Sequence, residues 1–271
     1  MQENKFKEGT IIKGKDLKGY TLCKILSADM NMKGFQYKTG MNEDINPLVR
    51  AGSCEVGLYF CLVQDACKYL DYGTVLATVR IPDDEEVYVD RGKFRTHRLE
   101  IREVMSLNEV TTWEYLVKFG ADITAGNNAA VRLATISNHL DVVKYLHENG
   151  ADITADNNFA IRMAAYWGYL EVVKYLYENG ADITARNNEA IRFAAGNGYL
   201  EVTKYLHEHG ADIMARNNEA VRSAAISGYL EVVKYLHKNG ADITVKNKHA
   251  IRFAEEKGHM DVVRYLKANM M

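Results

Sequence analysis

The chain has 271 residues, of which 47% are hydrophobic and 26% are charged, so it can form one or two domains with buried cores. Its formal net charge of −2 provides no overall positive field, and we therefore do not expect a nucleic acid partner. The first residues lack the apolar core of a signal peptide and no run reaches the ~18 apolar residues of a membrane span, which predicts a soluble, cytoplasmic protein that does not contact membranes.

The first 105 residues contain the β-branched and aromatic clusters that are typical of strands. We predict strands at Gly34–Gly40, Gly57–Leu62, Thr74–Pro82, Glu86–Asp90 and His97–Val104. Between the second and the third of these we expect a short helix that ends at Gly73, and the basic stretch Lys5–Gly19 is expected to be a solvated rim. This order of elements predicts an α+β domain over residues 1–105.

All four cysteines lie in this N-terminal domain. They are Cys23, Cys54, Cys61 and Cys67, and none of their spacings gives the paired CxxC of a zinc site. We therefore interpret them as reduced thiols, and we predict neither a metal nor a cofactor for this chain.

From residue 106 onward the sequence repeats with a period of 30 residues. Gly-Ala-Asp followed by Ile recurs at Gly120, Gly150, Gly180, Gly210 and Gly240, and units 181–210 and 211–240 are identical at 22 of 30 positions. Apolar residues fall at helical spacing in two runs of each unit, which predicts two helices of about ten residues. One such pair buries too little apolar surface to fold alone. We therefore predict an all-α solenoid over residues 106–271, a degenerate half-unit followed by five repeats.

Small and polar residues mark the ends of the predicted helices. Gly168, Gly198, Gly228 and Gly258 close the first helices, with Asn138 in the remaining unit, because a left-handed residue is needed there. Asn128, Asn158, Asn188 and Asn218 precede the first helices, and we expect their side chains to cap the free amides. His147, His207 and His237 recur at one position of the second helices, which we expect to be a solvated face.

The repeated Ala-Ala pair, Gly-(Tyr/His)-Leu-Glu-Val-Val and Asn-Gly-Ala-Asp-Ile resemble the ankyrin-repeat family over about residues 107–271. Ankyrin units usually have about 33 residues, so these units are shorter, and residues are missing where the family forms a projecting β-hairpin finger. Short units with these motifs are most similar to the ankyrin-repeat proteins of mimivirus-like giant amoebal DNA viruses. The resemblance implies a scaffold that binds a host or viral protein through the concave face of its solenoid, in the host cytoplasm if the chain is viral.

One arginine per repeat never varies. These are Arg132, Arg162, Arg192, Arg222 and Arg252, near the place of the family's histidine. They could form a ladder that binds an acidic or phosphorylated ligand. We favour a structural role, in which each arginine bonds loop carbonyls or the repeated aspartates and replaces the bonds of the family's Thr-Pro-Leu-His turn.

The positions that vary between repeats indicate a candidate partner-binding surface. The loops and the starts of the first helices place Arg186, Glu189, Arg216 and Glu219 there, and one unit gathers Phe159, Tyr166 and Trp167. Interface hot spots are enriched in aromatic residues and arginine. We therefore predict that these seven residues bind the protein partner, although the aromatic residues could instead pack under a neighbouring unit.

The N-terminal domain is loosely similar to the core of ADP-ribosyltransferase-like domains, through its Gly-Leu-Tyr-Phe strand, its helix and its Val-rich strand that ends in Ile-Pro. It lacks the Arg or His expected on the first strand and the Ser-Thr-Ser strand, and the nearest counterparts of the site are Tyr37, Tyr59 and Glu103. An enzyme targeted by its repeats is therefore the alternative hypothesis. We predict instead that the chain is not an enzyme and that this domain caps the solenoid.

Overall fold

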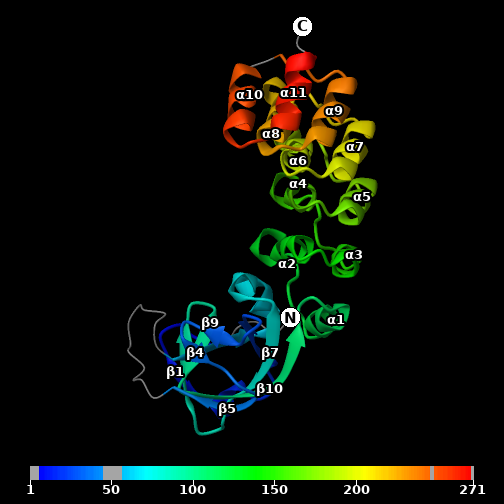
Figure 1. Cartoon of the computed structure of the whole chain (residues 1–271). Coiled ribbons are helices and arrows are strands. Elements are labelled where there is room, and N and C mark those ends of the chain that lie inside the picture. Colours follow the sequence, from blue (N-terminus) through cyan, green and yellow to red (C-terminus); the bar gives the residue numbers. More distant parts are fainter. Residues whose placement is uncertain (1–5, 45–56, 245–246, 270–271) are drawn as a thin grey trace. The chain divides into compact units, whose positions relative to one another are not determined.

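The computed structural model describes residues 6–44, 57–244 and 247–269, without the side chains of 247–249. A strand-rich region is followed by a series of helices, which confirms the predicted fold class (Figure 1). The chain forms two compact units, residues 1–134 together with 144–151 and residues 135–143 together with 152–271, and each is described by itself. These units are defined by the contacts within each of them, and they do not divide the chain at residue 105, where strands give way to helices. The predicted domain boundary after residue 105 therefore stays a prediction.

The N-terminal elements are β1 (Ile11–Lys13), η1 (Gly14–Leu17), β2 (Leu22–Leu26), β3 (Asn31–Met32), β4 (Phe35–Gln36), β5 (Gly40–Glu43), β6 (Leu58–Leu62), η2 (Val63–Tyr72), β7 (Val75–Arg80), β8 (Glu86–Asp90), β9 (Lys93–Thr96) and β10 (Arg98–Ser106). The helices that follow are α1 (Val110–Lys118), α2 (Ala125–Ile136), α3 (Leu140–Glu148), α4 (Ala155–Trp167), α5 (Leu170–Glu178), α6 (Ala185–Gly196), α7 (Leu200–Glu208), α8 (Ala215–Ser227), α9 (Leu230–Lys238), α10 (Asn247–Glu256) and α11 (Met260–Ala268).

The N-terminal strands form an antiparallel sheet in the order β1-β8-β9-β6-β2-β7-β10-β5, and β3 and β4 form a separate hairpin. Strand β2 is central, with Cys23 opposite Cys61 on β6 and Lys24 opposite Ala77 on β7. The sheet buries an apolar core in which the rings of Phe60 and Phe94 stack with their centroids 5.3 Å apart. The alternation of side chains along these strands thus produces one buried core.

Strands β6, β7, β8 and β10 confirm four of the predicted strands, and η2 confirms the short helix, although it is a 3-10 helix with a kink at Tyr69. The strand predicted at Gly34–Gly40 is wrong in extent, because the chain turns at Lys33 and Gly34 with positive φ angles and only Phe35–Gln36 pairs before the next strand begins at Gly40. The basic stretch is not only a solvated rim, since β1 lies within it and pairs with β8. Strands β2 and β9 were not predicted.

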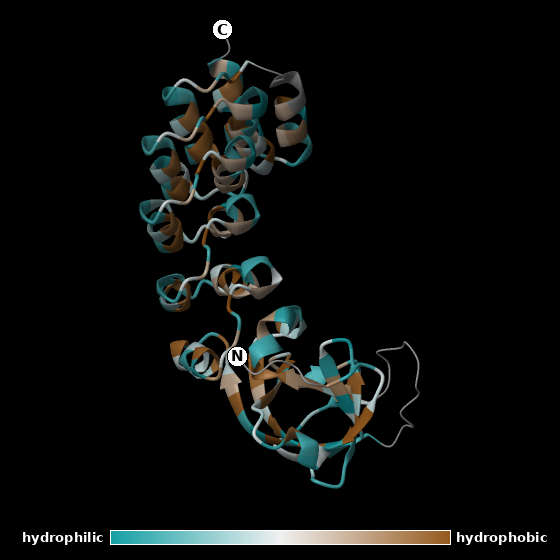
Figure 2. Cartoon of the chain, turned by 180° about the vertical axis from the view of Figure 1, so that it is seen from behind, coloured by the Kyte–Doolittle hydropathy of each residue, from teal (hydrophilic) through white to brown (hydrophobic). Residues whose placement is uncertain are grey.

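The repeats stack as two rows of helices, which Figure 1 shows for α4, α6, α8 and α10 in one row and α5, α7, α9 and α11 in the other. The helices carry an apolar and a polar face (Figure 2). The alanine pairs of the first helices, such as Ala194 and Ala195, are fully buried, so these helices approach one another closely. In the part of the chain that is described, no helix is both long and apolar enough to cross a bilayer.

The predicted helix ends are confirmed at the residues that close them. Asn138, Gly168, Gly198, Gly228 and Gly258 have φ angles of 58°, 79°, 84°, 86° and 81°, which is the left-handed conformation. The expectation of a solvated histidine face is wrong for two residues. His207 and His237 are half-buried, and their Nδ1 atoms share hydrogen bonds of 2.9 and 2.8 Å with the hydroxyls of Tyr235 and Tyr265 in the following repeat.

Candidate functional site

Four of the first helices, α2, α4, α6 and α8, begin with a turn of three consecutive left-handed residues. In α6 these are Arg186, Asn187 and Asn188, with φ angles of 53°, 58° and 59°, and α2, α4 and α8 repeat the pattern. Left-handed conformation costs most residues about 1–2 kcal/mol each, and asparagine tolerates it better than others. The Asn-Asn pair therefore occurs where the backbone needs it, in the short connection between Ala-Asp-Ile and the first helix.

The repeated arginine holds this turn closed. Arg192 Nε donates to the carbonyl oxygen of Asn187 at 3.0 Å, and its Nη2 donates to that of Arg186 at 3.3 Å. Arg162 makes the same two bonds, at 3.0 and 3.1 Å, to Asn157 and Asp156. These carbonyls do not lie in regular helix, so the guanidinium satisfies polar groups that would otherwise lack a partner.

The same arginines reach the next repeat. Arg192 Nη1 lies 2.8 Å from Glu219 Oε1, and Arg162 Nη1 pairs in the same way with Glu189. The side chains of Arg162 and Arg192 are only 5% and 3% exposed, whereas those of Glu189 and Glu219 are 18% and 32% exposed, so water reaches only the glutamate side of these ion pairs. Glu189 and Glu219 were predicted to bind the partner, and the structure places both in contact with arginines of the preceding repeat.

The remaining arginines of this position are less enclosed. Arg132 Nη1 donates to the carbonyl oxygens of Gly126 and Asn127 at 2.8 and 3.0 Å, and Arg222 Nε donates to that of Asn217 at 3.0 Å. Arg252 lies on the surface, where its Nε is 3.6 Å from Glu256 Oε1. The structure thus brings Arg162 and Arg192 into ion pairs between repeats, and Arg132 and Arg222 into bonds with their own turns.

Three of the four asparagines expected to cap the first helices, Asn158, Asn188 and Asn218, bond elsewhere, which corrects that prediction for them. Asn158 Oδ1 accepts a hydrogen bond of 2.8 Å from the backbone N–H of Asp182, 24 residues further along, and Asn188 does the same for Asp212. The left-handed backbone turns the side chain away from its own helix and toward the next repeat. Asp182 Oδ1 in turn accepts from the N–H and the hydroxyl of Thr184, so it serves its own loop.

The predicted aromatic group lies at the end of α4 and is exposed. Tyr166 and Trp167 are 37% and 47% exposed and pack edge to face, with ring centroids 5.0 Å apart. Tyr166 makes a second edge-to-face contact of 5.3 Å with Phe193 of α6, which sequence reasoning missed. Phe159 lies apart from this pair, half-buried at the start of the same helix beside Arg162. The sequence could have indicated Phe193, because its position varies between repeats. The residues there are Leu133, Met163, Phe193, Ser223 and Phe253.

The two predicted loop arginines are exposed. Arg186 lies on the surface in the left-handed turn of α6, and Arg216 occupies the same place in α8, with a side chain that is 57% exposed. Arg216 Nε is 3.5 Å from Glu219 Oε2, so Glu219 contacts arginines of two repeats. Of the charged residues predicted to bind the partner, Arg186 and Arg216 are thus exposed, whereas Glu189 and Glu219 already form ion pairs with arginines of the preceding repeat.

The N-terminal unit holds a pocket of about 100 Å³ between β2, β6, β9, the β3–β4 hairpin and the end of η2. Tyr37 and Tyr59, two counterparts of an ADP-ribosyltransferase-like site, both line it. Glu103, the third, lies exposed on β10 and is not among the lining residues. Burial raises the pKa of Tyr37 above its ordinary value. The lining also includes Lys24 and Lys93, which the sequence analysis did not single out.

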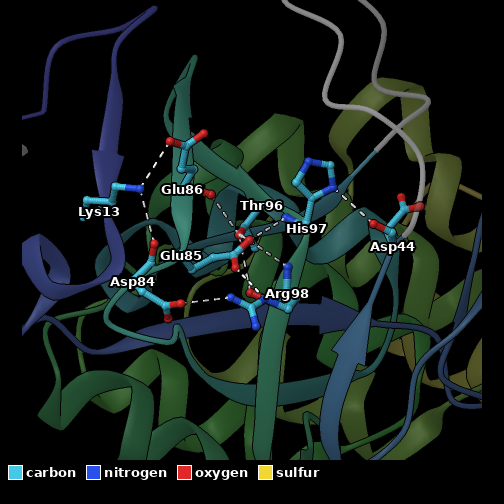
Figure 3. A network of polar contacts seen from close by, with 8 residues as sticks. All are labelled: Lys13, Asp44, Asp84, Glu85, Glu86, Thr96, His97 and Arg98. Atoms are coloured by element: carbon cyan, nitrogen blue, oxygen red, sulfur yellow. Dashed lines mark hydrogen bonds and ion pairs between the residues drawn. The ribbon is translucent and has the colours of Figure 1, made fainter.

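A second polar cluster of this unit surrounds the buried carboxylate of Glu85, the residue directly before β8 (Figure 3). Glu85 Oε1 accepts from Thr96 Oγ1 at 2.9 Å and from the backbone N–H groups of His97 and Arg98 at 3.2 and 3.1 Å, and Oε2 accepts from Arg98 Nε at 2.7 Å. Four hydrogen bonds occupy both oxygens of this carboxylate. The cluster thus ties β8 to the start of β10.

Comparison with known proteins places the repeats in a family. A family model described as ankyrin repeats (3 copies) matches residues 104–187 and 161–247, more than half of the chain. The chain is 33% identical over 135 residues to "Putative ankyrin repeat protein R229" and 36% identical over 129 residues to "Putative ankyrin repeat protein R896", both of Acanthamoeba polyphaga mimivirus. It is also 28% identical over 118 residues to "Uncharacterized protein R869" of the same virus.

These similarities cover parts of the proteins. Each covers 41% to 45% of this chain, and the chain spans 44% of the length of R229 and 39% of R896, although it spans 86% of R869. The resemblance to mimivirus ankyrin proteins is thereby confirmed. Together with the stacked helix pairs described above, the match shows that the chain belongs to the ankyrin-repeat family.

Proposed function

We propose that this chain binds a protein partner, of the host or of a virus, through the face that its first helices and their left-handed turns form. Ankyrin repeats are a protein–protein interaction module. The observation that carries the proposal is the exposed edge-to-face pair of Tyr166 and Trp167, extended by Phe193. Large aromatic side chains that stay in water at one place on a repeat array are the usual anchors of an interface.

The charged residues complete the proposed surface. Arg186 and Arg216 lie exposed in the turns that follow the aromatic repeat along the array, so an acidic segment of the partner would complement them. Phe159 is half-buried and offers the partner only part of its ring. Glu189 and Glu219 would contribute mainly by fixing Arg162 and Arg192, since their oxygens are engaged there.

The test uses residues that other repeats already carry. The variant Tyr166→Ile with Trp167→Ser gives the second repeat, residues 151–180, the pair that stands at Ile136–Ser137 and at Ile226–Ser227, so the fold is expected to persist. The matched control is Lys204→Ala, which removes a charge from the second-helix row. Affinity capture from an amoebal lysate with the wild type and both variants, followed by mass spectrometry, identifies proteins that need the aromatic pair.

The proposal requires a partner that the wild type and Lys204→Ala capture and the double variant loses, and whose purified form then binds at least about tenfold more weakly to the double variant, as loss of a hot spot predicts. Arg186→Gly provides a second variant. Glycine stands at the same place in Gly126, so the turn is kept while the cation is removed. Equal capture by all variants would exclude this surface as the binding site.

A further inference from the structure

One lysine of the N-terminal unit is buried at the base of the pocket described above. Lys24 on β2 is 3% exposed, and its Nζ donates to the carbonyl oxygen of Tyr59 at 2.7 Å and to Met32 Sδ at 3.5 Å. The same Nζ lies 4.7 Å from the centroid of the Tyr37 ring. Among the described residues no carboxylate comes within ion-pair distance of it. An amine buried without an opposite charge reduces stability, so its presence calls for an explanation.

The charged residues of the pocket favour an anion over a cation. Lys33 and Lys93 line it together with Lys24, and Asp44 is the acidic residue of the lining that the structure describes. The pKa of Lys24 is lowered to about 7, mainly by burial and in smaller part by the charge of Lys93 on β9, while Cys61 on β6 acts in the opposite sense. A bound anion beside Nζ would offset this loss of hydration and would raise the pKa again.

The walls of the pocket are largely aromatic. Phe35, Tyr37, Tyr59, Tyr69 and Tyr72 line it from the β3–β4 hairpin and the loop after it, from β6 and from η2. Lys93 Nζ lies 4.5 Å from the centroid of the Tyr59 ring, so a cation and an aromatic face adjoin at its edge as well as at its base. Aromatic walls with a few fixed polar groups are typical of sites for flat small molecules.

We propose that this pocket binds a small anion that carries a planar ring, with Lys24 as the buried counter-charge and with the tyrosine rings packed against the ring of the ligand. The volume of about 100 Å³ is smaller than the cavity of about 150 Å³ that is known to hold benzene, so the pocket would enclose only part of such a ligand and the rest would extend out of it. Two kinds of molecule share this chemistry, an aromatic carboxylate and a nucleotide with its base and phosphate. The site is separate from the proposed partner-binding surface and does not depend on it.

The experiment is isothermal titration of the full chain with benzoate and with AMP. Acetate and benzyl alcohol supply the separate halves of benzoate, and inorganic phosphate and adenosine supply those of AMP. The proposal requires that benzoate or AMP binds at least about tenfold more tightly than either of its halves, and the probe that binds identifies the kind of ligand. Binding of neither probe, or equal binding of a probe and one of its halves, would overturn it.

Variants test the role of Lys24 itself. Lys24→Met is expected to weaken binding at least about tenfold, because the counter-charge is lost. Lys18→Met is the matched control, since Lys18 pairs with Asp83 and does not line the pocket. Lys93→Gln, on the rim, is expected to weaken binding severalfold, and it keeps the test decisive if Lys24→Met does not fold. Unchanged affinity in a folded Lys24→Met, or in Lys93→Gln where Lys24→Met does not fold, would contradict the assignment.

The pH dependence gives an independent readout. Between pH 7 and pH 8.5 the free Lys24 loses its proton, and only its ammonium form pairs with an anion, so the affinity of the wild type should fall about tenfold. Tyr37 and Tyr69 also face the pocket, but burial raises the pKa of both above this interval. A fall of the same size in Lys24→Met would show that another group is responsible.

Discussion

Arg192 Nη1 donates to Glu219 Oε1 in the next repeat at 2.8 Å, while Arg192 Nε donates to the carbonyl oxygen of Asn187 in its own repeat at 3.0 Å. One guanidinium therefore closes a left-handed turn and joins two repeats. A side chain with fewer donors in a different geometry could not make these bonds together. This relationship gives a physical reason for Arg162 and Arg192, while Arg132 and Arg222 share with them the bonds to the turn.

The first prediction concerns the loss of this guanidinium. Arg192→Gln removes the bonds to the turn and leaves Glu219 with Arg216 as its remaining arginine, so we expect the array to lose about 1.5–3 kcal/mol, the range for hydrogen bonds to charged groups. The measurement is the melting temperature by calorimetry. Arg252→Gln is the control, because its side chain is 61% exposed and its ion pair with Glu256 should contribute less than about 1 kcal/mol. Equal melting temperatures for the wild type and Arg192→Gln would refute the structural role.

The second prediction concerns the asparagine that bonds to the next repeat. Asn188→Gly keeps the left-handed backbone but loses the hydrogen bond that the N–H of Asp212 donates to Asn188 Oδ1, and we expect this loss to cost about 1 kcal/mol. Asn188→Ala loses the bond and also strains the turn, where φ is 59°, which adds about 1–2 kcal/mol. Urea denaturation of both variants gives the two differences. If alanine destabilised no more than glycine, the backbone strain inferred here would be absent.

These asparagines show how far the sequence alone could predict this structure. The period of 30 residues and the helical spacing of apolar residues were enough for the helix pairs, and glycine was enough for the helix ends, because these features depend on neighbouring residues. The partner of Asn188 is Asp212, 24 residues away. A local rule offered only a cap on the adjacent helix, whereas the observed bond forms when two repeats stack.

The N-terminal unit was harder to predict for a related reason. Strand β2 has a lysine, Lys24, within a short apolar run, and its burial depends on neighbours from β6 and the β3–β4 hairpin. The sequence indicated Tyr37 and Tyr59 as site residues through a resemblance, and the structure brings both to one pocket. It gave no sign of Lys24 as a third lining residue, because strand pairing over 35 residues, from Lys24 to Tyr59, brings them together.

The third prediction concerns the thiols. Cys23, Cys61 and Cys67 are buried, with Cys23 Sγ 3.6 Å from Cys61 Sγ, and Cys54 lies outside the described residues. The hydrogen bond to Cys61 and burial raise the pKa of Cys23 well above its ordinary value, and burial raises that of Cys67 to about 12. We therefore expect iodoacetamide at pH 8 to leave these three unmodified in the folded chain and to modify them in urea. Peptide mass spectrometry measures this, and rapid labelling of Cys23 in the native chain would contradict it.

The fourth prediction is a dependence of stability on pH that arises at Lys24. Its pKa is lowered by burial from 10.5 to about 7, so below pH 7 it is protonated in both the folded and the unfolded chain. Between pH 7 and about pH 10 the unfolded chain holds a proton that the folded chain lacks, and the free energy of unfolding therefore rises with pH. Lys24→Met removes this effect, so it should be more stable than the wild type at pH 6, by up to about 5 kcal/mol, and this advantage should shrink toward pH 10.

The measurement has to follow the unit that holds Lys24. The chain has two tryptophans, and Trp113 is buried in that unit with its Nε1 donating to the carbonyl oxygen of Leu107 at 2.7 Å. In a Trp167→Ser background, the fluorescence of Trp113 during urea denaturation reports on this unit alone. Lys18→Met in the same background is the control, since the pair of Lys18 and Asp83 is exposed and its loss should change stability little at either pH. A difference between Lys24→Met and the wild type that stays constant from pH 6 to pH 10 would show that Lys24 keeps its ordinary pKa and is hydrated in the folded chain.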